Sequence, residues 1–316
     1  MTNIKARDKE HLSNIIIATI KDKGSRCNLN HIDFSGIKDF SYLFNFENFN
    51  GDISQWDVSN VVDMKFMFTS SFFNGDISTW NVANVQNMTS MFAHGRFNMN
   101  IPDWRHGLLP FLKTKFSKNL PVYGISAWNV SKIETMHNMF AYTSFNGDIS
   151  AWNVASVQDM SCMFIHSQFN GNISKWNVAN VINTSSMFSE SHFNQDLSKW
   201  DTSNVLNMDF MFHRSHFQQN ISNWFLHNKV HMQFMFDAKS LETLSAPTAY
   251  HWLAILNDCK ITKPYKNSIQ DIYNMYAPLA NVLESDLSAM AVVIQNLWKL
   301  DQNPKHQHNA LELPTL

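Results

Sequence analysis

The chain has 316 residues, with 24 Lys and Arg, 26 Asp and Glu, and a formal net charge of −2. A nearly neutral chain has no overall field to attract nucleic acid, so nucleic acid is disfavoured as a partner. Its three cysteines, Cys27, Cys162 and Cys259, are too few for a disulfide framework and too far apart for a CxxC motif. No stretch approaches the roughly 20 apolar residues of a membrane span.

The first residues, 1–24, are predicted to form a helical N-terminal cap. Between residues 7 and 23 the apolar side chains Leu12, Ile15, Ile16 and Ile20 recur at helical spacing, and Gly24 is a typical helix stop. The apolar run is too short and too broken for a secretory signal peptide. We therefore expect a cytoplasmic protein, with surface display or secretion by a non-classical route as the alternative.

Residues 25–240 repeat with a period of 24. Each tryptophan is followed twelve residues later by a phenylalanine, from Trp56 and Phe68 to Trp224 and Phe236. A fixed period of this length is typical of stacked repeats, in which each unit buries its apolar face on its neighbours. We predict nine coils, of which the first, 25–48, is divergent.

Each unit has two kinds of apolar spacing. In the second unit Phe49, Gly51 and Ile53 alternate with polar residues, which predicts a short strand. The residues from Val61 to Phe68 have the spacing of a helical or 3-10 turn. The predicted fold is a solenoid, with a short parallel strand and a helical turn in each coil, and we interpret the aromatic and Met columns as core.

The polar columns are expected to be structural, because Asp or Asn at the Asp52 position and Ser at the Ser54 position recur in nearly every unit. Positions that differ between units are free of that constraint and available for recognition. Among them we select Phe66, Phe210, Arg214 and Phe234, since aromatic and Arg side chains tend to anchor interfaces.

The unit at 97–120 keeps its length but departs furthest from the consensus. Two interpretations stay open: a decayed repeat, or a bulge that docks a protein partner. The second makes it our first choice for a site, with the candidate residues Arg105, His106, Leu108, Phe111, Lys113, Lys115 and Lys118.

After Leu241 the period disappears. Residues 241–300 are predicted to form a helical C-terminal domain, because apolar side chains recur there at helical spacing, and 301–316 are predicted to be a disordered tail. The helices could cap the array, or could also form a homodimer or a partner contact.

The sequence gives little support for catalysis. It contains no Walker loop, no HExxH motif and no nucleophile elbow, so we expect no enzyme activity and no cofactor. The one exception is a weak metal hypothesis, since His192 and His216 share a column one period apart and His213 lies nearby.

The units "FNGDISQWDVSNVVDMKFMF" and "FNGDISAWNVASVQDMSCMF" resemble those of the BspA-like leucine-rich-repeat family of bacterial surface proteins, over residues 25–240. The resemblance implies a right-handed leucine-rich-repeat-like solenoid that acts in adhesion or protein interaction. Our hypothesis is a non-catalytic bacterial or phage scaffold that binds a protein as an intracellular regulator, inhibitor or sensor. The alternatives are a cell-surface adhesin and a metal-dependent activity at the histidines.

Overall fold

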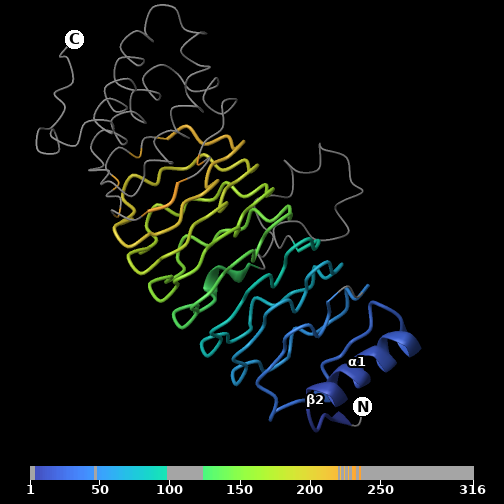
Figure 1. Cartoon of the computed structure of the whole chain (residues 1–316). Helices are drawn as coiled ribbons and strands as arrows, with labels where there is room; N and C mark the ends of the chain where they lie inside the picture. The colour runs from blue at the N-terminus through green and yellow to red at the C-terminus, as the bar shows by residue number, and fades with distance from the viewer. Residues whose placement is uncertain are drawn as a thin grey trace, which may run out of the picture.

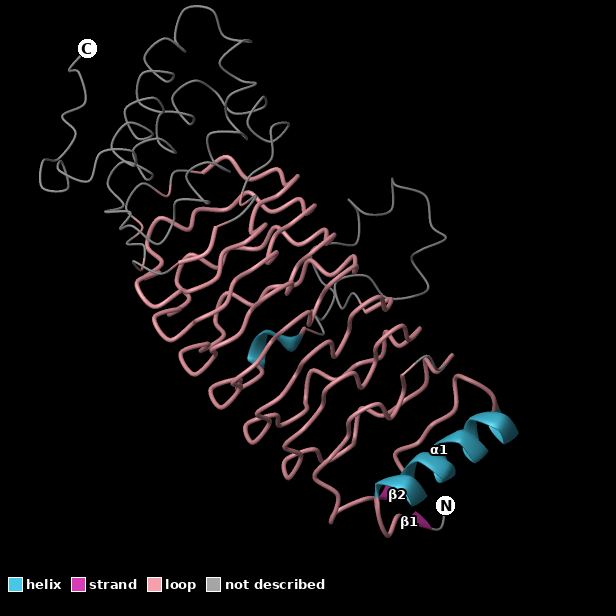
Figure 2. Ribbon diagram, in the orientation of Figure 1, coloured by secondary structure: helices cyan, strands magenta, loops and turns pink. Residues whose placement is uncertain are grey.

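In the computed structural model, the described residues are 4–45, 48–97, 124–219, 221, 224, 227, 230–232 and 235. Successive units lie side by side in one elongated stack, with helix α1 (Lys9–Lys23) at its N-terminal end (Figure 1). The other regular elements of the described part are strands β1 (Ile4–Lys5) and β2 (Ile32–Asp33) and the 3-10 helix η2 (Ile125–Ala127). Figure 2 shows that turns and loops make up the remainder.

Helix α1 begins and ends at the signals that its sequence provides. The Asp8 carboxylate accepts the backbone N–H of His11 at 2.8 Å, and the Gly24 N–H donates to the carbonyl of Ile20. Leu12 and Ile16 are fully buried and belong to the same apolar core as the first units. The predicted helix is therefore present, while its role as a cap stays a prediction.

The units are joined by a ladder of backbone hydrogen bonds. Single parallel bridges connect one residue of each unit to the equivalent residue of the next, through Asp39, Asp63, Asn87, Thr135, Asp159, Asn183, Asn207 and His231. Beyond each bridge, alternate N–H groups donate to the next unit, as Met64 does to Asn87 at 2.9 Å and Phe66 to Thr89 at 2.8 Å. The N–H groups in between close turns within their own unit, as Met67 does to Met64 at 3.2 Å.

This ladder corrects two details of the expected coil. The unit-to-unit bridges run through the Asp63 position and not through the predicted strand at 49–54, where the described bridges include only Asn28 with Asp52. The segment from Val61 to Phe68 contains the Asp63 bridge followed by a turn, and not a helical turn. It cannot be helical because five of its eight N–H groups bond to neighbouring units.

Columns of parallel aromatic rings fill the core, as predicted. Phe68 and Phe92 stack with centroids 5.7 Å apart, and Trp56 and Trp80 with centroids 6.4 Å apart and planes 3° from parallel. Each described tryptophan of the stack donates its indole N–H to a carbonyl 27 residues earlier, as Trp152 does to Ile125 at 2.9 Å, or 51 residues earlier for Trp128. The indole therefore supplies both apolar area and a bond to the preceding unit.

The predicted coil at 97–120 lies almost wholly outside the described residues, and the described stack differs from the prediction because it passes directly from the Asn87 unit to the Thr135 unit. Asn87 bridges Thr135 directly, and Phe92 stacks on Phe140 with centroids 5.7 Å apart. Within one unit the chain normally passes from Phe to Ile in four residues, as from Phe49 to Ile53, whereas Phe97 and Ile125 are 28 apart. The extra length equals one period, so the units on either side of the irregular segment are neighbours.

The prolines of the irregular segment give a physical reason for this difference. Pro110 stands at the position of Val62 and Gln86, whose N–H groups bond to the preceding unit at 2.8 and 2.9 Å. Pro102 stands at the position of Ser54, whose N–H bonds to Asp52 at 3.0 Å. Proline has no N–H and can make neither bond.

The predicted C-terminal helical domain at 241–300 and the tail at 301–316 lie outside the described residues. Within the part that is described, no helix is long and apolar enough to cross a membrane.

Candidate interaction surface

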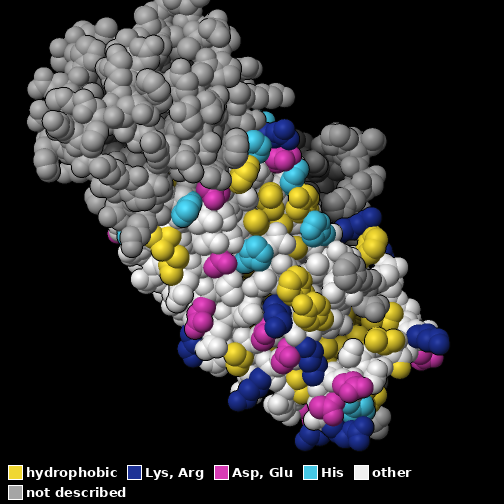
Figure 3. Space-filling view, in the orientation of Figure 1, with side chains coloured by type: hydrophobic (Ala, Val, Ile, Leu, Met, Phe, Trp, Pro, Cys, Tyr) yellow, Lys and Arg dark blue, Asp and Glu magenta, His cyan; other side chains and the backbone are white. Residues whose placement is uncertain are grey.

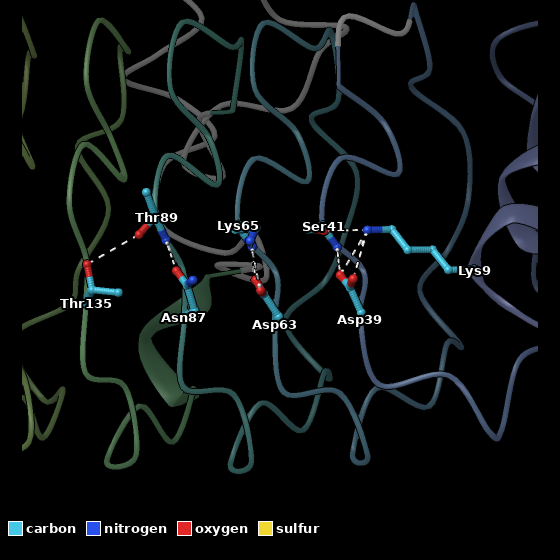
Figure 4. Close-up of polar contacts among 8 residues, drawn as sticks. All are labelled: Lys9, Asp39, Ser41, Asp63, Lys65, Asn87, Thr89 and Thr135. Carbon is cyan, nitrogen blue, oxygen red and sulfur yellow. Dashed lines mark hydrogen bonds and ion pairs between the residues drawn. The ribbon is translucent and has the colours of Figure 1, made fainter.

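The recurring Asp and Asn side chains are used for the architecture of the turns. In each of three columns, the side-chain oxygen accepts the N–H two residues later, as in Asp148 with Ser150, Asn177 with Ala179 and Asn87 with Thr89. These are Asx turns, which Asp and Asn form readily. The Asp52 column, predicted to be structural, therefore forms turns within its units. Figure 4 shows a second of the three turn columns, from Asp39 to Asn87.

The same bonds explain the electrostatics of the carboxylates. The Ser150 N–H and then its hydroxyl hold the pKa of Asp148 below its ordinary value. Asp196 is held low in the same way by Ser198, with a smaller contribution from Lys199. A pKa lowered by a turn that recurs in the repeats indicates structure and not a catalytic acid.

Two positions in each turn have left-handed backbone. Their φ angles lie between +51° and +65°, and the residues are Tyr42, Phe66, Ser90, Asn138, Cys162, Ser186 and Phe210 at the first position and Ser70, His94, Tyr142, His166, Glu190 and Arg214 at the second. This conformation costs roughly 1–2 kcal/mol for a residue other than glycine. The left-handed conformation is retained at both positions although the side chains there differ in size and chemistry. The hydrogen-bond ladder therefore determines the backbone conformation and leaves the side chain free to vary.

The two left-handed positions form one edge of the stack, together with the residue two places after the second of them. We call its variable residues the turn-edge strip: Tyr42, Phe66, Phe72, His94, Arg96, Tyr142, His166, Glu190, His192, Phe210, Arg214 and His216. The exposed large aromatic side chains of the described residues all belong to it: Tyr42 at 49%, Phe72 at 41%, Tyr142 at 45% and Phe210 at 37%. Figure 3 shows hydrophobic and histidine side chains gathered in a band along the stack.

Neighbouring side chains of the strip contact one another. Tyr42 stacks on Phe66 with centroids 4.9 Å apart, and the Arg96 guanidinium lies 4.2 Å above the centre of the Phe72 ring. Such contacts restrain side chains that would otherwise be mobile, and restrained aromatic and Arg residues are favoured at interfaces.

The centre of the strip is a stack of alternating imidazole and phenol rings. His94, Tyr142 and His166 follow one another with centroid distances of 4.4 and 4.5 Å. His166 Nε2 then lies 3.2 Å from a Glu190 carboxylate oxygen, whose other oxygen is 4.0 Å from Arg214. The strip therefore presents aromatic, imidazole, anionic and cationic groups in a fixed order.

The structure describes three of the aromatic and Arg candidates selected from the sequence. Phe66 is half-buried against Tyr42, Phe210 is exposed and contacts His213, and Arg214 lies beside Glu190. Phe234 and the candidates Arg105, His106, Leu108, Phe111, Lys113, Lys115 and Lys118 lie outside the described residues. Sequence reasoning did not select Tyr42, Phe72, His94, Arg96 or His166, although all of them occupy variable columns of the repeat.

The histidine pair offers two ligands and not three. The rings of His192 and His216 are 4.7 Å apart, and His216 Nδ1 lies 3.2 Å from the Ser191 carbonyl. His213 instead meets the edge of Phe210. Among the described residues no group of three or more His, Cys, Asp or Glu side chains could hold a metal ion.

The described cysteines have raised thiol pKa values. Burial raises the pKa of Cys162, and the nearby Asp159 carboxylate raises it further. Burial also raises the pKa of Cys27. Neither environment favours the thiolate that a nucleophile or metal ligand requires.

Away from the strip, an open groove of about 850 Å³ runs across several units. It is lined by uncharged amides and hydroxyls, the exposed aliphatic side chains of Ile182 and Leu206, and the side chains of Lys132, Glu134 and His227. Lys132 Nζ is already bonded to Asn84 at 2.7 Å. The groove lacks the aromatic anchors that distinguish the strip.

The stack of 24-residue units defines the chain as a repeat protein. Three overlapping stretches, residues 17–122, 110–192 and 166–247, match one family, described as "Mycoplasma protein of unknown function, DUF285". Together they span most of the chain, so the chain belongs to this family. Comparison with curated proteins and with solved structures gives no match.

Proposed function

We propose that the protein is a non-catalytic scaffold that binds a protein partner through the turn-edge strip. The observation that carries this proposal is the concentration of exposed large aromatic side chains, among the described residues, on that one edge. An aromatic surface rimmed by polar groups on a rigid support is typical of protein interaction sites. The assignment rests on this site and not on the family, whose function its description leaves open.

The finer description of the fold belongs to the same proposal. We interpret the stack as a leucine-rich-repeat-like solenoid of the BspA type, closed at its N-terminal end by α1. The parallel bridges between equivalent residues and the buried Leu12 and Ile16 support this interpretation. A cytoplasmic location, with action as a regulator, inhibitor or sensor, stays a prediction.

Site-specific photocrosslinking in the cells that produce the protein tests the function. A benzophenone amino acid placed at Tyr142 reports on the strip, and the matched control places it at Gln158, an exposed residue that lines the groove. We expect covalent adducts with a protein at position 142 and few at position 158. Equal adduct formation at both positions would contradict the assignment of the strip as the partner-binding surface.

A second comparison separates the strip from the irregular segment. The comparison uses a shortened variant in which residues 98–124 are replaced by Asn-Gly-Asp, the three residues found at 74–76. If the strip carries the contact, crosslinking at position 142 persists in this variant. Loss of the adduct would instead support the irregular segment, which is the first choice from the sequence, as the site of partner contact.

A further inference from the structure

We propose that the turn-edge strip is self-complementary, and that it pairs with the strip of a second copy of the chain in an antiparallel two-fold dimer. This inference rests on the proposed function, because it names the partner of the same surface. It is distinct from a dimer through the predicted C-terminal helices.

The symmetry of such a dimer determines which residues meet. A two-fold axis that lies in the interface and crosses the stack reverses the order of the units, but leaves each column facing its own counterpart. In an isologous contact, residue i of one copy meets residue j of the other, and j meets i. The columns of the strip can therefore be tested for pairing one register at a time.

One register brings complementary groups together at three pairs of the left-handed columns. Its axis passes between the units that carry Tyr142 and His166, so these two residues face each other. One unit further out His94 faces Glu190, and beyond it Phe66 faces Phe210. A phenol meets an imidazole, an imidazole meets a carboxylate, and an aromatic ring meets an aromatic ring.

Within one chain, neighbouring units already make contacts of the first two kinds. Tyr142 and His166 stack with centroids 4.5 Å apart, and His166 lies 3.2 Å from Glu190. Between the outer pairs, Ser90 faces Ser186, and these small side chains allow close approach. All of these residues share the same left-handed backbone, which gives them equivalent orientations on the edge.

Neighbouring registers are less favourable. Sliding one copy along the other by one unit moves the axis by half a unit. Toward the C-terminus this sets His94 opposite Arg214 and His166 opposite its own copy, and toward the N-terminus it sets His94 opposite His166. Each shift removes the imidazole–carboxylate pair between His94 and Glu190, and the loss of complementary pairs opposes the wrong alignment.

Sedimentation equilibrium of the full chain tests the proposal. We expect a dimer whose dissociation constant rises at least about ten-fold in either Glu190→Lys or His94→Glu, because the first removes the carboxylate opposite His94 and the second sets two carboxylates opposite each other. The double variant restores the opposite pair in reversed order and should return to within about three-fold of the parent. Glu134→Lys, at an exposed residue that lines the groove and not the strip, is the matched control and should leave the dimer unchanged.

Two results would overturn the dimer. One is a parent protein that stays monomeric at about 100 μM. The other is a dimer that both single variants leave intact, which would place the contact elsewhere. A monomer that still crosslinks another protein at position 142 would overturn this inference alone, whereas equal crosslinking at 142 and 158 would overturn the proposed function itself.

Discussion

Asn87 and Thr135 form a parallel bridge across 48 residues of sequence, whereas the next bridges on either side, Asp63 with Asn87 and Thr135 with Asp159, join residues 24 apart. The geometry is the same although the chain between the partners is twice as long. At this point the stack is therefore closed by direct bonds between units that are two periods apart in sequence.

This closure predicts that the irregular segment can be removed without loss of the stack. Replacing residues 98–124 by Asn-Gly-Asp joins Phe97 to Ile125 with the normal spacing of four residues. A shorter loop costs less closure entropy, so we expect the free energy of unfolding to stay equal or rise by up to about 1.5 kcal/mol. Denaturant unfolding monitored by tryptophan fluorescence measures the change.

Deleting only half of the segment serves as the control, and should give an intermediate value. A melting temperature lowered by more than about 5 °C in the full replacement would show that the segment supports the stack.

The sequence predicted the period, the first unit and the aromatic core, because those features depend on side-chain spacing alone. Side-chain spacing alone does not reveal whether the unit at 97–120 lies in the stack, since Trp104 and Phe116 keep the register either way. The decisive fact is which N–H groups bond between units. Pro110 lacks one of these donors, and this signal was visible in the sequence.

The candidate site was predicted in part for a similar reason. Variation between units singled out Phe66, Phe210 and Arg214, which the structure places on one edge. The His94–Tyr142–His166 stack is continuous because the units that carry His94 and Tyr142, 48 residues apart in sequence, are adjacent in the structure. Counting with a uniform 24-residue period would place another unit between His94 and Tyr142, so the contact could not be foreseen.

The indole hydrogen bonds predict a large cost for a conservative change in the core. Trp152→Phe removes the donor to the Ile125 carbonyl and leaves a cavity at a residue that is 3% exposed. We expect a loss of about 2–4 kcal/mol in the free energy of unfolding. Leu206→Ala, at a side chain 37% exposed, is the control and should cost about 0.5 kcal/mol or less. Similar costs for the two variants would refute a structural role for the indole bond.

Apolar contacts, and not the visible ion pair, are predicted to hold α1 in place. Lys9 Nζ lies 3.0 Å from the Asp39 carboxylate and also contacts Ser41, as Figure 4 shows, but the pair is partly exposed. Lys9→Ala should therefore cost less than about 1 kcal/mol. Leu12→Ala empties a fully buried position and should cost about 2–5 kcal/mol. Chemical denaturation of the two variants compares them directly, and the reverse ranking would make the ion pair the main attachment.

The Asx turns predict sensitivity to acid. Because the Ser150 N–H and hydroxyl lower the pKa of Asp148 in the folded state, its contribution is present above the unfolded value of about 3.9. The contribution is lost as pH falls through the lower, folded pKa. Asp148→Asn keeps the turn, as Asn172 does in the next unit with a 3.0 Å bond to Ser174, but cannot titrate. Its unfolding free energy should fall less steeply below about pH 4, and identical pH profiles for variant and parent would contradict this origin.

The left-handed turn positions predict opposite effects of two substitutions at one site. Ser70 has a φ of +56° and donates its N–H to Ala93 at 2.8 Å, so the backbone there is held by the next unit. Ser70→Asn places a residue that tolerates this conformation and should raise the free energy of unfolding by about 0.5 kcal/mol. Ser70→Val places a β-branched side chain where it is strongly disfavoured and should lower it by at least about 1 kcal/mol. Thermal unfolding of the two variants measures the difference in stability. A valine variant as stable as the asparagine variant would mean that the backbone at residue 70 relaxes and that the hydrogen-bond ladder does not determine its conformation.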